Sequence, residues 1–163
     1  MQEINFLNDI GNHTYRVLKL NGCYYGNNCF PSLNNLIAEA ERHPCAYGKL
    51  KRQLEFVVIN AVRLQLRGYK ATRQVQLHFI FGERNKGVKR DYDNVLASAS
   101  KIICDGLVKA GVLKDDAPAY LLPSTCEFHY VDGNRYAGAS SFNTPALTSP
   151  SQIILLADAK TLS

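Results

Sequence analysis

The sequence lacks the features that would place a protein in a membrane or in an oxidising compartment. No apolar run approaches the roughly 18 residues that cross a bilayer. The opening residues include Glu3 and Asp9 and no basic stretch, so we expect no secretion signal. The five cysteines form no Cys-x-x-Cys pair, which argues against a disulfide scaffold and a zinc ribbon. We therefore expect a cytoplasmic protein without membrane contact.

The composition is typical of a folded protein. Of the 163 residues, 46% are hydrophobic and 20% are charged, which excludes a disordered tail. A chain of this length can bury one hydrophobic core, and no linker or internal repeat divides it. We expect a single domain over residues 1–163.

The charge is distributed unevenly along the chain. The whole sequence carries a net charge of +5, but residues 42–90 hold twelve Lys and Arg against two Glu. Acidic residues gather further on, at Asp91, Asp93, Asp105, Asp115 and Asp116. A basic surface beside an acidic cluster favours a polyanion bound by the first and a metal ion bound by the second. Charge alone does not separate DNA, RNA, a membrane surface or an ordinary solvated helix face.

Hydrophobic periodicity predicts the secondary structure. Alternation predicts strands, and apolar residues at three- and four-residue spacing predict helices. The expected strands are 14–20, 74–81, 119–131 and 152–157, the expected helices are 32–39, 49–67 and 94–110, and the expected loops include a basic one at 83–90 and a long one at 132–151. This β-α-α-β-α-β-β order predicts one α+β domain with helices packed on one face of a sheet.

The acidic residues flank the third predicted helix. In an extended backbone, Asp91 and Asp93 would face one site, and Asp93 or Asn94 would stand at the helix N-terminus. Asp116 follows the far end of the helix, more than about 20 Å from Asp93 at 1.5 Å per residue. The acids therefore converge only if the chain doubles back after Gly111 or if a second subunit supplies one set.

Converging carboxylates need a counter-ion, and Mg²⁺ or Mn²⁺ is the natural one because hard cations take oxygen ligands. Each acidic group also has a simpler interpretation. Asp93 alone is typical of a helix cap, Asp115 and Asp116 of a solvated turn, and Lys101 with Asp105 of a surface ion pair. An Asp-x-Asp pair also occurs in glycosyltransferases, but the sequence has no Gly-rich nucleotide-binding turn.

Taken in order, several segments resemble the RusA family of Holliday-junction resolvases, in its phage-type branch. The resemblance covers about residues 14–131 and is carried by FPSLNNLIAEAERH at 30–43, RDYDN at 90–94, KIICDGLVKAG at 101–111 and DDA at 115–117. It implies a RusA-like domain with a mixed or antiparallel sheet. It also implies a homodimeric, Mg²⁺-dependent endonuclease that makes paired nicks in four-way DNA junctions in recombination and repair, encoded by a bacterium or its phage.

The resemblance also assigns roles to individual residues. The metal-binding and catalytic aspartates fall on Asp91, Asp93 and Asp116, and the catalytic lysine falls on Lys101. The family pattern places this lysine about one helical turn after the second aspartate. Here Lys101 follows Asp93 by eight residues, which keeps it on a similar helix face but about one turn further along the helix. Basic residues of segments 49–52 and 84–90 would contact the DNA backbone. They are Lys49, Lys51, Arg52, Arg84, Lys86, Lys89 and Arg90.

Two alternatives stay open at this point. A nuclease of the same kind could act on flaps, forks or other branched DNA, because junction selectivity depends on dimer geometry that sequence does not display. A non-catalytic DNA-binding protein could retain the fold and use the carboxylates structurally.

Overall fold

The computed structural model describes residues 4–5, 14–21, 30–84, 89–132, 135–136 and 151–158. The elements are β1 (Ile4–Asn5), β2 (Thr14–Asn21), α1 (Leu33–Arg42), α2 (Ala46–Gln65), β3 (Val75–Arg84), α3 (Tyr92–Lys109), β4 (Leu121–Asp132), β5 (Arg135–Tyr136) and β6 (Ser151–Asp158). The seven predicted elements are all present, so the chain folds as the expected α+β type. Among the described residues, no helix is long and apolar enough to cross a membrane.

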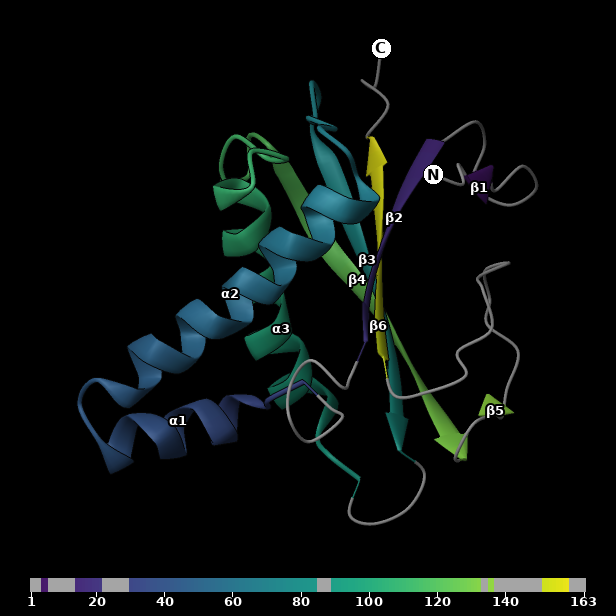
Figure 1. Cartoon of the computed structure of the whole chain (residues 1–163). Helices are drawn as coiled ribbons and strands as arrows, with labels where there is room; N and C mark the ends of the chain where they lie inside the picture. Colours follow the sequence, from purple (N-terminus) through teal and green to yellow (C-terminus); the bar gives the residue numbers. More distant parts are fainter. Residues whose placement is uncertain are drawn as a thin grey trace.

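The strands form one mixed sheet in the order β1-β2-β6-β3-β4-β5. The β3 and β4 strands are parallel and joined by α3, whereas every other pairing is antiparallel. The last strand, β6, lies between β2 and β3, so the C-terminal segment completes the centre of the sheet (Figure 1). The sheet is therefore held together by pairings between segments that are far apart in sequence.

Some predicted boundaries were wrong. The β3 strand runs to Arg84, so Glu83 and Arg84 belong to the sheet instead of the basic loop. The short strands β1 and β5 were not predicted, and β5 pairs with the end of β4 inside the expected 132–151 loop. Positions 133–134 and 137–150 of that loop, and 85–88 of the basic loop, lie outside the described residues.

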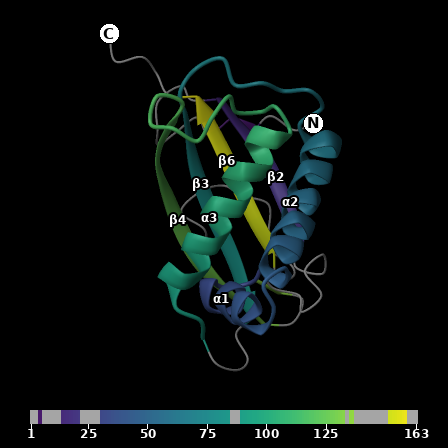
Figure 2. The same ribbon diagram turned by 90° about the vertical axis from the view of Figure 1, so that its left-hand side faces the viewer.

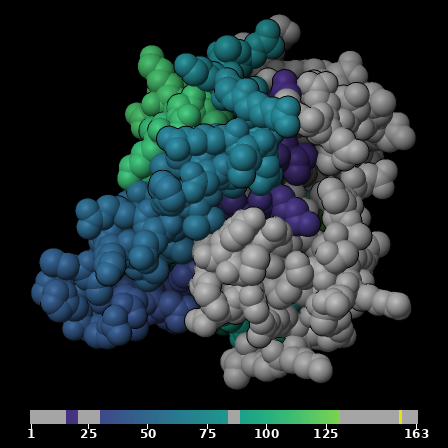
Figure 3. Space-filling view, viewed as in Figure 1, coloured from purple at the N-terminus to yellow at the C-terminus, as the bar shows by residue number. Residues whose placement is uncertain are grey.

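The helices cover one face of the sheet, as the element order predicted. In Figure 2, α2 and α3 lie side by side over the strands, and α1 crosses near their lower ends. Figure 3 shows α1 and α2 as one continuous outer surface of this helical layer. Between the layers lies the core, which includes Leu18, Leu20, Leu54, Val58, Val75, Leu77, Phe79, Phe81, Ile102, Ile103, Leu107 and Leu156.

The α2 and α3 helices approach each other closely at Gly106. A Cβ atom at this position would lie 2.6 Å from Val58 Cγ1 and 2.8 Å from Val58 Cβ. Such distances are well below van der Waals contact, so only glycine allows this separation of the helix axes. The glycine thus fixes the position of α3, the helix that carries most of the predicted site.

The chain reverses direction directly after α3. Gly111 has a φ of 77°, in the left-handed region that glycine adopts readily. The amide of Val112 donates to the carbonyl of Leu107 at 2.9 Å, and both Val112 and Leu113 are buried. This reversal directs the following residues back alongside α3, as convergence of the acidic residues within one chain requires.

Candidate active site

The α3 helix begins earlier than the sequence pattern predicted. Asp91 is the N-cap residue, with extended backbone angles, and Tyr92 and Asp93 already belong to the first turn. The expectation of an extended backbone through both aspartates was therefore wrong. Asp91 is exposed and its Oδ2 accepts a hydrogen bond from the side chain of Asn94 at 3.3 Å. Asp93 stands in the first turn, where the helix dipole favours a negative charge.

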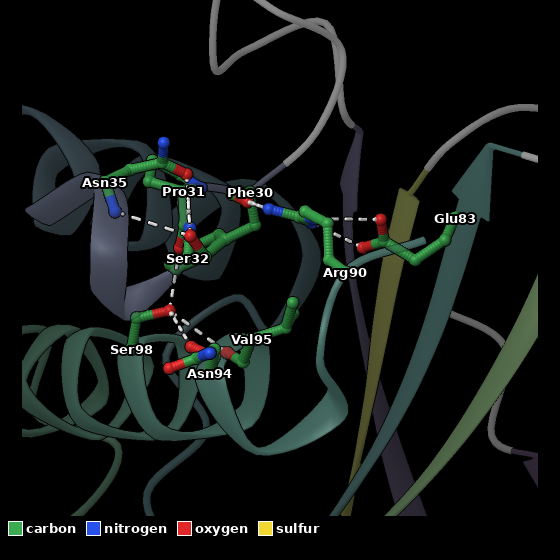
Figure 4. Close-up of polar contacts among 9 residues, drawn as sticks. All are labelled: Phe30, Pro31, Ser32, Asn35, Glu83, Arg90, Asn94, Val95 and Ser98. Atoms are coloured by element: carbon green, nitrogen blue, oxygen red, sulfur yellow. Dashed lines mark hydrogen bonds and ion pairs between the residues drawn. The ribbon is translucent and has the colours of Figure 1, made fainter. Parts of the chain in front are cut away.

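The segment before α1 is tied to the start of α3. Ser32 and Asn35 form a capping box, in which the Ser32 amide donates to Asn35 Oδ1 at 3.0 Å. Ser98, on α3, donates to the carbonyl of Pro31 at 2.7 Å (Figure 4). Ser32 and Asn35 of the FPSLNN stretch thus cap the N-terminus of α1, and the hydrogen bond from Ser98 holds this end of α1 against α3.

Arg90, directly before the two aspartates, connects the start of α3 to β3 and to the segment before α1. Its guanidinium binds Glu83 through two bonds, Nη2 to Oε1 at 2.6 Å and Nε to Oε2 at 3.1 Å, and Nη1 donates to the carbonyl of Phe30 (Figure 4). Both charged side chains are largely buried. We therefore assign Arg90 a structural role, because each of its three side-chain nitrogens donates within the protein. Its contact with DNA stays a prediction.

Between α3 and the start of β4 lies a groove of about 480 Å³. It brings together three of the four predicted catalytic residues, Asp93, Lys101 and Asp116. Asp91 is outside this lining. The remaining walls are formed by Leu96, Ala97, Ser100, Cys104, Leu121 and Ser124. The extra helical turn before Lys101 therefore leaves it on the same face as Asp93.

Asp116 reaches the groove because of the reversal at Gly111. Its Oδ2 accepts a hydrogen bond from Lys101 Nζ at 3.0 Å, and this bond lowers the pKa of the Asp116 carboxyl. The neighbouring Asp115 is not part of the groove lining, and its Oδ1 accepts the backbone amide of Asp116 at 2.8 Å. The two adjacent aspartates therefore differ in role: Asp115 shapes the turn and Asp116 faces the groove.

Lys101 is held between two carboxylates. Its Nζ lies 2.9 Å from Asp105 Oδ1 as well as 3.0 Å from Asp116 Oδ2. The bonds to Asp105 and then to Asp116 raise the pKa of Lys101, so the side chain stays protonated. Asp105, whose side chain is only 17% exposed, also accepts from Lys51 Nζ at 2.7 Å. Burial acts to raise the pKa of Asp105, but the two lysines outweigh it and the pKa is lowered.

This chain of alternating charges continues between α2 and α3. Lys51 lies 3.4 Å from the buried Glu55, which is also bound by Lys109. From the sequence, Asp105 was recognised only as a surface partner of Lys101, and the involvement of Glu55 and Lys109 was missed. The four-residue spacing of Lys101 and Asp105 was the available signal, but the partners on α2 are fixed only by helix packing. Lys51, for which a contact with DNA stays a prediction, is paired here with the carboxylates of Asp105 and Glu55.

The other predicted DNA-binding residues have different surroundings. Lys49 and Arg52 are exposed on the first turns of α2, and Lys89 is exposed just before α3. Lys89 Nζ lies 4.3 Å from the centre of the Tyr130 ring. Arg84 ends β3, but its side chain, like the whole of Lys86, lies outside the described residues.

The donor set of the groove suits a hard cation in part. Within the described ranges, no group of three or more His, Cys, Asp or Glu side chains is placed to hold a metal ion. Asp93 and Asp116 nevertheless offer two carboxylates in one groove. Mg²⁺ commonly binds through one or two carboxylates, several waters and substrate phosphates, so carboxylates of this number are chemically sufficient where they share one ion. The third predicted ligand, Asp91, is two residues from Asp93 at the helix cap.

Comparison with known proteins gives no assignment. No model of a protein family matches the chain, and no curated protein matches it significantly. A function for this chain is therefore inferred from its own residues.

Proposed function

We propose that this protein is a Mg²⁺-dependent, structure-selective endodeoxyribonuclease of the RusA type, which acts as a homodimer on four-way DNA junctions. The observation that carries the proposal is the groove shared by Asp93, Lys101 and Asp116. These residues come from both ends of the RDYDN-to-DDA pattern, and Asp93 and Asp116 are 23 positions apart in sequence. Carboxylates that hold a metal ion and a cationic lysine are groups that support metal-assisted phosphodiester hydrolysis.

Each residue has a distinct task in this proposal. Asp93 and Asp116 bind the cation, with Asp91 available from the helix cap. When bound, Mg²⁺ supplies the Lewis acidity that polarises the phosphate and activates a water molecule. Lys101 stabilises the negative charge that develops on the scissile phosphate. Asp105 keeps the Lys101 ammonium in place at 2.9 Å, so the lysine needs little reorganisation when substrate arrives.

DNA binding would depend on exposed cations of α2 and of the segment before α3. Lys49, Arg52 and Lys89 are exposed and are the candidates for backbone contacts. Contacts with phosphates are independent of sequence and weaken steeply with salt concentration. A two-fold symmetric dimer matches the two equivalent strands of a junction, so each subunit would cut one strand.

The test is cleavage of an end-labelled synthetic four-way junction with and without Mg²⁺. We expect paired symmetric nicks from the wild type, and a loss of about a hundredfold or more in Asp93→Asn and Asp116→Asn. Asp115→Asn is the matched control, because the asparagine Oδ1 can still accept the Asp116 amide that Asp115 accepts now. The control is expected to cut normally.

Three outcomes would change the proposal. Cleavage by Asp116→Asn at the wild-type rate would overturn the assignment of the groove as the metal site. Binding of the junction without cleavage in Mg²⁺ or Mn²⁺ would favour a non-catalytic DNA-binding protein. Equal cleavage of flaps and forks would retain the nuclease and remove the junction selectivity.

A further inference from the structure

A ladder of aromatic rings leads from the core to the surface beside the groove. The rings of Phe79 and Phe81 are stacked with centroids 6.0 Å apart, and Phe81 stacks on Phe128 at 4.6 Å. The last ring is Tyr92, stacked on Phe128 at 4.3 Å with an interplanar angle of 21°. Because the inner rings are buried in the core, Tyr92 is held in a fixed orientation.

Tyr92 is exposed despite this stacking. It is 51% accessible to solvent, although one side of its ring is covered by Phe128. Its hydroxyl accepts a hydrogen bond from Tyr130 Oη at 3.3 Å. Lys89 stands over the Tyr130 ring, 4.3 Å from its centre. An exposed, anchored aromatic ring is thus present at the start of α3, and a lysine stands over the ring of its hydrogen-bond partner, Tyr130.

The position of this ring in the sequence relates it to the proposed chemistry. Tyr92 lies between Asp91 and Asp93, in the first turn of α3. Asp93 lines the groove, so a group that stacks on Tyr92 would lie within one helical turn of a carboxylate proposed to hold the metal. The pairing of a flat apolar surface with a lysine matches a nucleotide, which presents a base for stacking and a phosphate for the cation.

We propose that Tyr92 is a stacking platform for an unpaired nucleobase adjacent to the scissile phosphate, with Lys89 contacting the phosphate of the same nucleotide. This inference rests on the proposed function and makes it more specific. A rigid ring loses little conformational entropy on binding, and every base has a face that can stack on it. The platform would favour sites where bases are already unstacked, such as the crossover of a junction, over continuous duplex.

The experiment is photocrosslinking of the full-length protein to junctions that carry 5-iodouracil at successive positions around the crossover, without divalent metal so that the DNA stays intact. Crosslinks are assigned by mass spectrometry. Trypsin cleavage after Arg90 and Lys101 releases residues 91–101, in which Tyr92 is the sole tyrosine. Binding constants and Mg²⁺-dependent cleavage are measured on the same junctions.

We expect a crosslink in peptide 91–101 from a position next to the cut phosphate. Tyr92→Leu should lose this crosslink and bind the junction about five- to a hundredfold more weakly, the range expected for a lost base stack. Tyr92→Phe should bind like the wild type, because stacking needs only the ring. Phe56→Leu is the matched control: Phe56 is similarly exposed at 59% but lies on α2, so its replacement should leave the crosslink unchanged.

The outcomes separate this inference from the proposed function. If Tyr92→Leu binds within twofold of the wild type and the wild type shows no crosslink in peptide 91–101, the platform is refuted while cleavage still supports the nuclease. If the wild type neither binds nor cuts the junction, both proposals fail. Melting temperatures of all variants show whether a weaker affinity reflects loss of the ring or loss of the fold.

Discussion

Replacement of Gly106 by alanine tests whether the spacing of α2 and α3 is set by this glycine. The added Cβ would lie 2.6 Å from Val58 Cγ1 and 2.8 Å from Val58 Cβ. Ordinary contacts begin near 3.4 Å, so the helices must separate by roughly 0.8 Å or the valine must change rotamer. Val58 is fully buried and belongs to the core, so neighbouring side chains restrict both movements.

The expected cost follows from two opposing contributions. Overpacking of a dense core costs about 1–3 kcal/mol. Alanine is favoured over glycine inside a helix by about 1 kcal/mol, which offsets part of this cost. We therefore expect Gly106→Ala to lower the free energy of unfolding by about 1 kcal/mol, and the melting temperature by about 2–4 °C in a domain of this size.

Urea unfolding of a small set of variants measures this effect. Gly48→Ala, also inside a helix but with no atom within 4 Å of its added Cβ, should be neutral or stabilising. Val58→Ala removes the closest contact, Cγ1, and leaves the Cβ contact at 2.8 Å, so Gly106→Ala should cost less in that background. We expect a favourable coupling of about 0.5–1 kcal/mol between the two sites. Strict additivity, or stabilisation by Gly106→Ala alone, would refute the reasoning.

Three further predictions concern the charged residues and a buried thiol. Asp105→Asn should lower stability by about 1–2 kcal/mol at pH 7, because Asp105 accepts from two lysines. Since the folded-state pKa of Asp105 is lowered, its stabilisation is present above the unfolded value of about 3.9 and is lost as the pH falls through the folded value. The difference between wild type and Asp105→Asn in urea should therefore shrink towards pH 3, and a constant difference would contradict this. Arg90→Ala leaves the largely buried Glu83 unpaired and should cost about 2–3 kcal/mol by the same assay, whereas a cost below about 0.5 kcal/mol would refute its structural role. Burial, followed by the nearby carboxylate of Asp116, raises the pKa of Cys104 to about 11, so iodoacetamide at pH 8 should label the exposed Cys45 and spare Cys104 in peptide mass spectra.

The order of helices and strands was predictable because it depends on short-range patterns. The alternation of Val75, Leu77, Phe79 and Phe81 indicates a strand with one buried face, and all four side chains are buried. Glycines that end helices are also recognisable from local sequence, as Gly111 is after α3. The predicted ends of the helices were less accurate. The α3 helix starts two residues before the expected Asn94, because the cap is Asp91.

For the candidate site, the sequence predicted which residues belong to it but not which residues they contact. The order of motifs pointed to Asp91, Asp93, Lys101 and Asp116, and all of these except Asp91 line one groove. Periodicity also indicated that Lys101 would remain on the face of Asp93 despite the extra turn. The partners of each charge were not predictable. Arg90 and Lys51 looked like free cations in the sequence, but both are engaged by carboxylates from other elements.

By itself, the sequence determined the helices and strands, the single α+β domain and the acidic residues that could form a site, since these follow from patterns within a few residues or from motif order. The tertiary structure alone decided that β6 lies at the centre of the sheet and that Asp116 meets Lys101. It also decided that Tyr92 ends a stack of rings beside the groove. These contacts join residues from 15 to about 140 positions apart, and packing of the whole core, with its helix spacing and strand order, brings them together.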